Sequence, residues 1–161
     1  MQRIAISALI LSALMVVPSG QQPASAAVIP LSLNDLVQQS DVCIRGQVVN
    51  ASSAWSEGDS MIFTIYTVQM TEQLMGQSVE SVQVRVPGGT LDGVRIRNGE
   101  APTYLVGEEV VCFLRPEAGG TWQTFGWFQG KYTLLNGMVR EMLGTSYDAL
   151  RADILTAVAN K

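Results

Sequence analysis

Residues 61–71, MIFTIYTVQMT, carry the clearest strand pattern in the chain. Ile62 and Thr64 fall on one side of an extended backbone, and Phe63 falls on the other. Successive side chains of a strand point to opposite faces, and β-branched and aromatic residues favour strands. The stretch therefore predicts a long β-strand, and the polar residues 50–59 before it predict a long hairpin loop.

Further strands are predicted on both sides of this one. Apolar or alternating patterns indicate strands over residues 42–48, 79–86 and 106–114, and a closing hairpin formed by residues 121–128 and 131–135. Gln129-Gly130 is expected to form the turn of that hairpin, and Asn136-Gly137 is expected to form a further tight turn.

Helices are predicted at the two ends of the domain. Ser32-Leu33-Asn34-Asp35 has the form of a capping box and predicts a short helix that ends near Ser40. Thr145 and Asp148 form a second capping box, which predicts a helix over about residues 145–160. The elements together predict an all-β fold with minor α content, a small closed antiparallel β-barrel of the oligonucleotide/oligosaccharide-binding (OB) type with a short N-terminal helix and a C-terminal helix. A small sandwich is the alternative.

The start of the chain predicts a secretory signal peptide over residues 1–26. Met1–Arg3 is positively charged, residues 4–17 are apolar but too few to cross a bilayer comfortably, and Ala24-Ser25-Ala26 offers small residues for cleavage. The alternative is a retained membrane anchor, which the glycine and prolines after the apolar run disfavour. Residues 27–161 are then expected to form one exported domain without membrane contact after cleavage.

Charge and residue content exclude several classes of function. Without Arg3, nine basic side chains face fourteen acidic ones, so the mature chain is acidic and nucleic acid is not expected as a partner. The chain has no histidine, which excludes Ser-His-Asp and Cys-His catalysis and histidine-ligated metals. No recognisable catalytic motif is present, so neither an enzymatic activity nor a cofactor is predicted.

Glu108 and Glu109 are the strongest remaining candidates for a metal site or an acid–base pair. Adjacent side chains of a strand point to opposite faces, so the two carboxylates cannot both line one cleft. No metal site is therefore predicted, and one of the two glutamates is expected to pair with Arg95 or Lys131.

Glycines and arginines cluster in residues 84–100, VRVPGGTLDGVRIRNGE. The glycine amides and the charges of Arg85, Arg95 and Arg97 could bind an anion, but the spacing matches no phosphate-binding motif. The favoured interpretation is that Pro87-Gly88-Gly89 forms a turn that needs positive φ, while the arginines solvate an edge strand. The three arginines remain candidate partner-binding residues.

Aromatic residues crowd the predicted closing hairpin. They are Trp122, Phe125, Trp127, Phe128 and Tyr132. OB-type barrels stack sugars or bases on such rings, so Trp122 and Trp127 complete the set of candidate binding residues. Strand alternation sends about half of the rings inward, which predicts that Trp127 and at least two others lie in the core and that Trp122 is the most exposed.

The order of five motifs resembles a known set of proteins. LNDLVQQSDVCIRGQVV, IYTVQMTEQLMG, VRVPGG, APTYLVGEEVVCFL and GWFQGKYTL, within residues 31–135, look like a widespread set of small exported bacterial proteins of unassigned activity. The early part is similar, more distantly, to the netrin-like domain of tissue inhibitors of metalloproteinases, which is an OB-type barrel. The resemblance implies that fold, in a protein that is periplasmic or secreted.

Cys43 and Cys112 are the only cysteines, and each lies in an apolar run. In an oxidising compartment they are expected to form a disulfide, and the alternative is two buried thiols. The resembling set has apolar residues at both positions, which favours the disulfide because the two neighbouring sites are replaced together.

The barrel and the missing catalytic motifs predict a non-enzymatic binding domain that recognises an exported protein or an envelope glycan. The resemblance to metalloproteinase inhibitors implies an alternative, an inhibitor or regulator of an exported protease. Those inhibitors chelate zinc with an N-terminal cysteine, whereas the mature chain would begin at Ala27 or Val28, so inhibition by that route is not expected.

Overall fold

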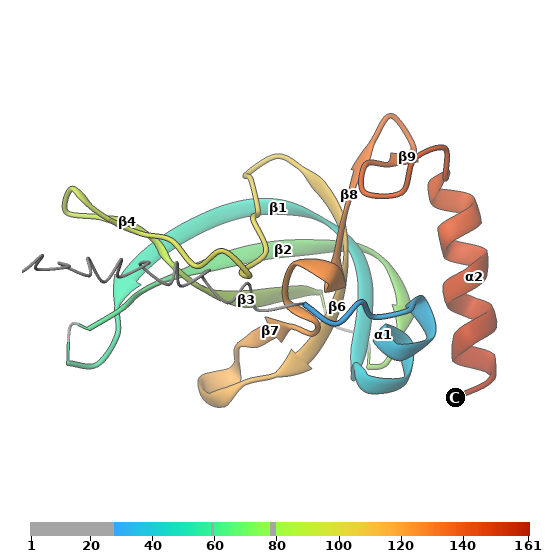
Figure 1. Cartoon of the computed structure of the whole chain (residues 1–161), viewed down its shortest axis with the longest axis horizontal. Coiled ribbons are helices and arrows are strands. Elements are labelled where there is room, and N and C mark those ends of the chain that lie inside the picture. The colour runs from blue at the N-terminus through green and yellow to red at the C-terminus, as the bar shows by residue number, and fades with distance from the viewer. Residues whose placement is uncertain (1–27, 59, 78–79) are drawn as a thin grey trace, which may run out of the picture.

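The computed structural model describes residues 28–58, 60–77 and 80–161 (Figure 1). The leader predicted for residues 1–26 lies outside these ranges. Within them the chain is mostly β-structure, with a short helix at the start and a longer one at the end. No helix of the described part is long and apolar enough to cross a membrane.

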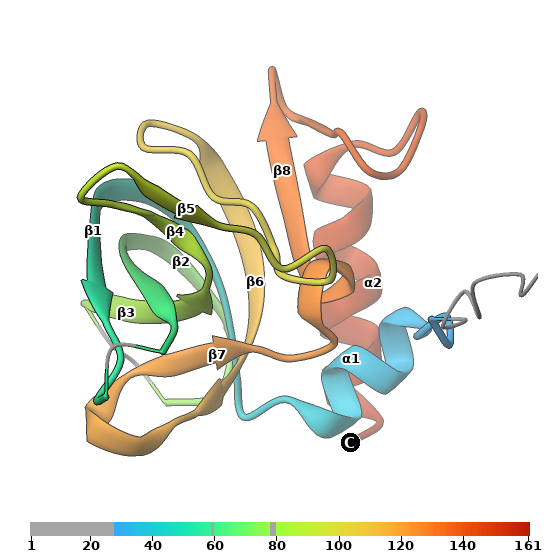
Figure 2. The ribbon, with the colours of Figure 1, turned by 60° about the vertical axis from the view of Figure 1, so that its left-hand side comes forward.

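The strands form a closed barrel with two small additions. The strands are β1 (Val42–Trp55), β2 (Ile62–Met75), β3 (Ser81–Pro87), β4 (Gly89–Leu91), β5 (Val94–Ile96), β6 (Glu109–Pro116), β7 (Trp122–Thr124), β8 (Lys131–Leu135) and β9 (Met138–Val139). The order β1-β2-β3-β7-β6 closes through a β1–β6 pairing, which confirms the predicted small OB-like barrel (Figure 2). The barrel is mixed rather than wholly antiparallel, because β3 and β7 run parallel and pair only at Val84 and Trp122.

Two cores lie on opposite faces of the same strands. Residues such as Ile44, Val68 and Cys112 fill the barrel, whereas Phe113 and its neighbours face the helices outside. α1 (Leu33–Gln39) and α2 (Tyr147–Ala159) pack against each other and cover this outer face, as Figures 1 and 2 show. Successive residues of β6 therefore belong to different cores, which explains why its sequence is almost continuously apolar.

The helix caps match the sequence at one end and differ at the other. Ser32 and Asp35 form the predicted capping box at α1. The cap of α2 is Ser146, whose hydroxyl accepts from the backbone N–H of Ala149, and not the predicted Thr145. Thr145 still belongs to the turn after β9, where its own N–H donates to a backbone carbonyl.

The predicted disulfide is not formed, and both cysteines are free and buried. In the β1–β6 register, Cys43 lies opposite Phe113, and Cys112 lies opposite Ile44. The two cysteines are therefore one residue out of register, and they point into different cores. Neighbouring strands bring their backbones close but send the thiols to opposite faces.

Alkylation should show both thiols to be protected in the folded protein. Burial raises the pKa of Cys112 to about 12 and that of Cys43 well above its ordinary value, so thiolate is scarce even at pH 9. We expect no iodoacetamide adduct on the native protein at pH 8–9, and two adducts in denaturant without reductant, measured by intact mass. Two adducts that require a reductant would instead show a disulfide.

The predicted closing hairpin is absent, because residues 122–135 form one interrupted strand along β6. Leu114 and Cys112 of β6 are two residues apart in the sequence. Their partners on the opposing strand, Thr124 and Lys131, are seven residues apart. The five extra residues, 126–130, bulge outward as the turn GWFQG, which contains the 3-10 helix η2 (Trp127–Gly130). The hairpin partner of β7 is β6 itself, joined through the 3-10 helix η1 (Ala118–Gly120).

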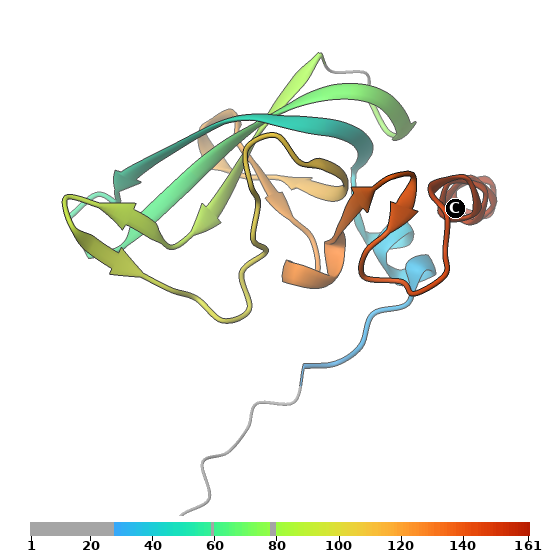
Figure 3. The same cartoon turned by 90° about the horizontal axis from the view of Figure 1, so that it is seen from above.

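The glycine-rich stretch has the predicted positive φ at Gly88 and Gly89 but not the predicted turn, and it forms a hairpin that the sequence did not reveal (Figure 3). Gly88 and Gly89 have φ of 107° and 147°, so the direct link from β3 to β4 needs glycine, although it is not a turn. β4 and β5 then pair around Asp92 and Gly93, which both have positive φ, as hairpin turns of the primed types require. Asn136-Gly137 makes the predicted tight turn between β8 and β9.

Candidate ligand-binding cleft

A hollow of about 530 Å³ lies on the outside of the barrel, where β3 diverges from β7. Its walls come from β2 and β3 on one side and from the end of β6, β7 and the GWFQG turn on the other. The residues that define it are Phe63, Arg85, Pro87, Arg115, Phe125 and Trp127. We call this hollow the Arg–aromatic cleft.

Stacking on aromatic rings fixes the two arginines of the cleft. The guanidinium carbon of Arg85 lies 3.4 Å from the centre of the Phe63 ring, and that of Arg115 lies 4.0 Å from the centre of the Phe125 ring. Such contacts stabilise by about 0.5–2 kcal/mol and orient the planar cation. Arg85 also pairs with Glu117 at 2.7 Å, whereas Arg115 has no carboxylate within ion-pair distance among the described residues.

The GWFQG turn presents Trp127 at the edge of the cleft on a strained backbone. Gly126 and Trp127 both have left-handed φ, 70° and 58°, which a bulky residue such as tryptophan rarely adopts. A Cβ on Gly130 would lie 1.8 Å from the carbonyl oxygen of Phe125, so only glycine lets the turn close. The Gln129 amide holds the turn from outside, because it accepts from the backbone N–H of Leu31 at 2.8 Å.

The predicted burial of Trp127 and the predicted exposure of Trp122 are wrong. Trp127 is 46% exposed and Phe128 47% exposed, whereas Trp122 is half-buried against the barrel core. The prediction assumed a regular strand through residue 128, and the left-handed turn breaks the alternation on which it rested. Phe125 and Tyr132 pack partly buried against the outer core.

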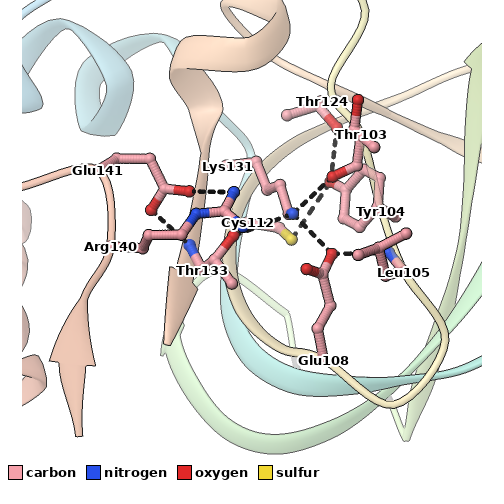
Figure 4. Close-up of polar contacts among 10 residues, drawn as sticks. All are labelled: Thr103, Tyr104, Leu105, Glu108, Cys112, Thr124, Lys131, Thr133, Arg140 and Glu141. Carbon is pink, nitrogen blue, oxygen red and sulfur yellow. Dashed lines mark hydrogen bonds and ion pairs between the residues drawn. The ribbon is translucent and has the colours of Figure 1, made fainter. Parts of the chain in front are cut away.

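Lys131 is buried in a polar cluster that anchors the loop between β5 and β6 (Figure 4). Its ammonium lies 2.6 Å from a carboxylate oxygen of Glu108 and donates to the Thr103 carbonyl and the Thr133 hydroxyl. The expected pairing of one glutamate with Lys131 is thus confirmed, and Glu109 pairs with Arg45 at 2.7 Å. This loop carries two residues that line the cleft, Asn98 and Pro102, so the ion pair holds a cleft wall in place.

Tyr104 extends the polar cluster into the barrel. Its hydroxyl donates to the Cys112 sulfur at 3.3 Å and lies 2.8 Å from the Thr124 hydroxyl (Figure 4). Burial raises the pKa of Tyr104 well above its ordinary value, so the hydroxyl stays neutral. These two contacts hold the Tyr104 ring in the barrel interior.

Among the described residues, no group of His, Cys, Asp or Glu has the make-up of a metal site.

A second hollow, of about 680 Å³, adjoins the cleft, and we call it the basic pocket. It is lined by Arg95 and Arg97, together with Ser53, Thr64, Tyr66 and Thr103. The structure thus separates the three arginines of the glycine-rich stretch, because Arg85 lines the Arg–aromatic cleft, whereas Arg95 and Arg97 line the basic pocket. A Cβ on Gly89 would lie 2.4 Å from the Thr64 hydroxyl oxygen, so glycine lets the β4–β5 hairpin sit close to the barrel.

Fold and site together define a class, a small closed β-barrel with flanking helices and an Arg–aromatic cleft at its seam. No protein-family model and no curated protein matches the chain.

The motif Gln129-Gly130-Lys131 has a physical role in this chain. Gln129 ties the start of the domain to the turn, Gly130 permits the close approach, and Lys131 makes the buried ion pair.

Arg115 is a cleft residue that the sequence analysis did not single out. Arg115 follows the apolar residues 110–114, VVCFL, near the end of β6. A charged residue directly after a buried stretch of a strand indicates that the strand reaches the surface there. Its stacking on Phe125 depends on the β6–β7 hairpin, which the sequence did not reveal.

Proposed function

We propose that the protein is a non-enzymatic exported binding domain that recognises an envelope partner through the Arg–aromatic cleft. The observation that carries the proposal is Trp127, whose half-exposed ring is held by a strained turn and lines the same cleft as the oriented guanidinium of Arg115. Non-glycine residues in left-handed conformations cost about 1–3 kcal/mol and persist where the surroundings enforce them, often at binding sites. Tryptophan and arginine are the residue types that most often dominate binding energy.

The cleft suits recognition better than protease inhibition by zinc chelation. The residues predicted to begin the mature chain, Ala27 or Val28, offer no side chain that ligates a metal. Gln129 bonds to the backbone of Ile29 and Leu31, and the apolar side chain of Leu31 lines the cleft. A protein or a glycan of the envelope fits a hollow built from rings and guanidinium groups.

Substitution of Trp127 tests the proposal directly. Trp127→Ala is expected to weaken capture of the partner from envelope extract at least about tenfold, because a hot-spot aromatic contributes about 2 kcal/mol or more. Phe128→Ala is the matched control, since Phe128 is equally exposed on the same turn but does not line the cleft. Equal loss in both variants, or unchanged capture in Trp127→Ala with wild-type binding intact, would refute the role of the cleft.

A further inference from the structure

Unpaired positive charge gathers at the two hollows of an otherwise acidic protein. The chain carries a net charge of −4, and five basic side chains of the described residues lie in ion pairs. Lys161 donates to backbone carbonyls at the end of α1. The remaining described cations, Arg95, Arg97 and Arg115, have no carboxylate within ion-pair distance, and all three line a hollow. Arg115 also donates from Nε to the backbone carbonyl of Gln39, which leaves its charge without a counter-ion.

The two hollows adjoin, and we call the pair the track. Pro87, Asn98 and Pro102 line both of them, so the cleft and the basic pocket meet at this shared wall. Trp127 and Arg115 lie in the cleft, and Arg95 and Arg97 lie in the basic pocket. An extended ligand that crosses the wall would meet guanidinium groups in both hollows.

The lining of the basic pocket is rich in hydroxyl groups, which lie beside apolar side chains such as Val86, Ile96 and Leu105. Ser53, Thr64, Tyr66, Thr90 and Thr103 all contribute to it. Hydroxyls and backbone groups bind the hydroxyls of a sugar, guanidinium groups bind carboxylates in a bidentate fork, and an exposed indole offers a flat face for stacking.

We propose that this track binds an acidic oligosaccharide, in which carboxylated sugars pair with Arg95, Arg97 and Arg115 and one ring stacks on Trp127. The inference rests on the proposed function and narrows its partner from a protein or a glycan to a carboxylated glycan. Because the track spans two hollows, it takes several consecutive sugars rather than one.

Calorimetric titration with defined probes tests the inference on the folded wild-type domain. We expect a hexamer of galacturonic acid to bind at least about tenfold more tightly than its methyl-esterified form, because esterification removes the charges that the guanidinium groups recognise. The trimer should bind more weakly than the hexamer, and added salt should weaken hexamer binding. Equal affinity for the acidic and esterified hexamers, or tighter binding of hexaglutamate than of the hexauronate, would overturn the inference.

Variants separate this inference from the proposed function. Arg95→Gln/Arg97→Gln is expected to lower the affinity for the hexauronate about tenfold, while Arg140→Gln, an exposed arginine outside both hollows, leaves it unchanged. If the double variant binds the hexauronate like wild type, the track is wrong. Capture of the envelope partner that still depends on Trp127 would then leave the cleft proposal standing.

Discussion

Lys131→Ala is expected to destabilise the domain by about 3–5 kcal/mol, because it leaves the carboxylate of Glu108 buried without its cation. The side chains of Lys131 and Glu108 are only 4% and 10% exposed, and their charged atoms lie 2.6 Å apart. The substitution also removes donors to the Thr103 carbonyl and the Thr133 hydroxyl. Urea unfolding monitored by tryptophan fluorescence measures the loss as a lower midpoint at an unchanged slope.

An exposed ion pair provides the control for this prediction. Arg140 is 57% exposed in its pair with Glu141, so Arg140→Ala should cost less than about 1 kcal/mol. Adding Glu108→Gln to Lys131→Ala should recover part of the lost stability, because the orphaned charge is then gone. A loss below about 1 kcal/mol for Lys131→Ala would show that the pair is not buried as described.

Gly130→Ala is expected to destabilise the domain by about 3 kcal/mol or more, at or beyond the upper end of ordinary overpacking. The added Cβ would lie 1.8 Å from the carbonyl oxygen of Phe125. That atom belongs to the backbone, so it cannot move aside without distorting the turn that carries Trp127. Thermal or urea unfolding gives the stability, and the near-ultraviolet circular dichroism of the tryptophans should change with the turn.

Gly99→Ala is the matched control for Gly130→Ala. No atom lies within 4 Å of a Cβ added at Gly99, and its φ lies outside the left-handed range. The substitution should be neutral, or stabilising by up to about 1 kcal/mol through the unfolded chain. Gly130→Ala and Gly99→Ala of equal stability would contradict the close approach between Gly130 and Phe125.

Local sequence chemistry was enough to predict the main elements of the fold. Alternation over residues 61–71 predicted the strand that the structure shows as the larger part of β2. The capping box at Ser32 predicted the start of α1. Both signals depend on neighbours in the chain, so no knowledge of distant contacts was needed. The closed barrel followed from the number of short strands and the glycines between them.

Two of the wrong predictions concern features set by register between distant strands. The disulfide failed because a shift of one residue in the β1–β6 pairing sends Cys43 and Cys112 to opposite faces. The closing hairpin failed because the turn at 126–130 inserts into a strand that continues along β6. Neither register can be read from the local pattern, since an extended run gives the same alternation with any partner.

The candidate site was predictable in its residue types but not in its arrangement. Trp127, Arg85, Arg95 and Arg97 do line the two hollows, whereas Trp122 lines neither. Which arginines carry an unpaired charge depends on acidic residues far away in the sequence, such as Glu117 for Arg85. Exposure of Trp127 depends on the left-handed backbone at positions 126 and 127, which strand alternation does not show.

The central claim, that recognition occurs in the Arg–aromatic cleft, is tested most directly by nuclear magnetic resonance of the ¹⁵N-labelled domain. The chain has three tryptophans, and only Trp127 lines the cleft, so their side-chain N–H signals report on separate places. On titration with the hexauronate or with the captured partner, the signals of Trp127 and the Arg115 guanidinium should shift, while that of Trp55 stays in place. Shifts confined to α2 and the outer helical face, with Trp127 unmoved, would contradict the claim.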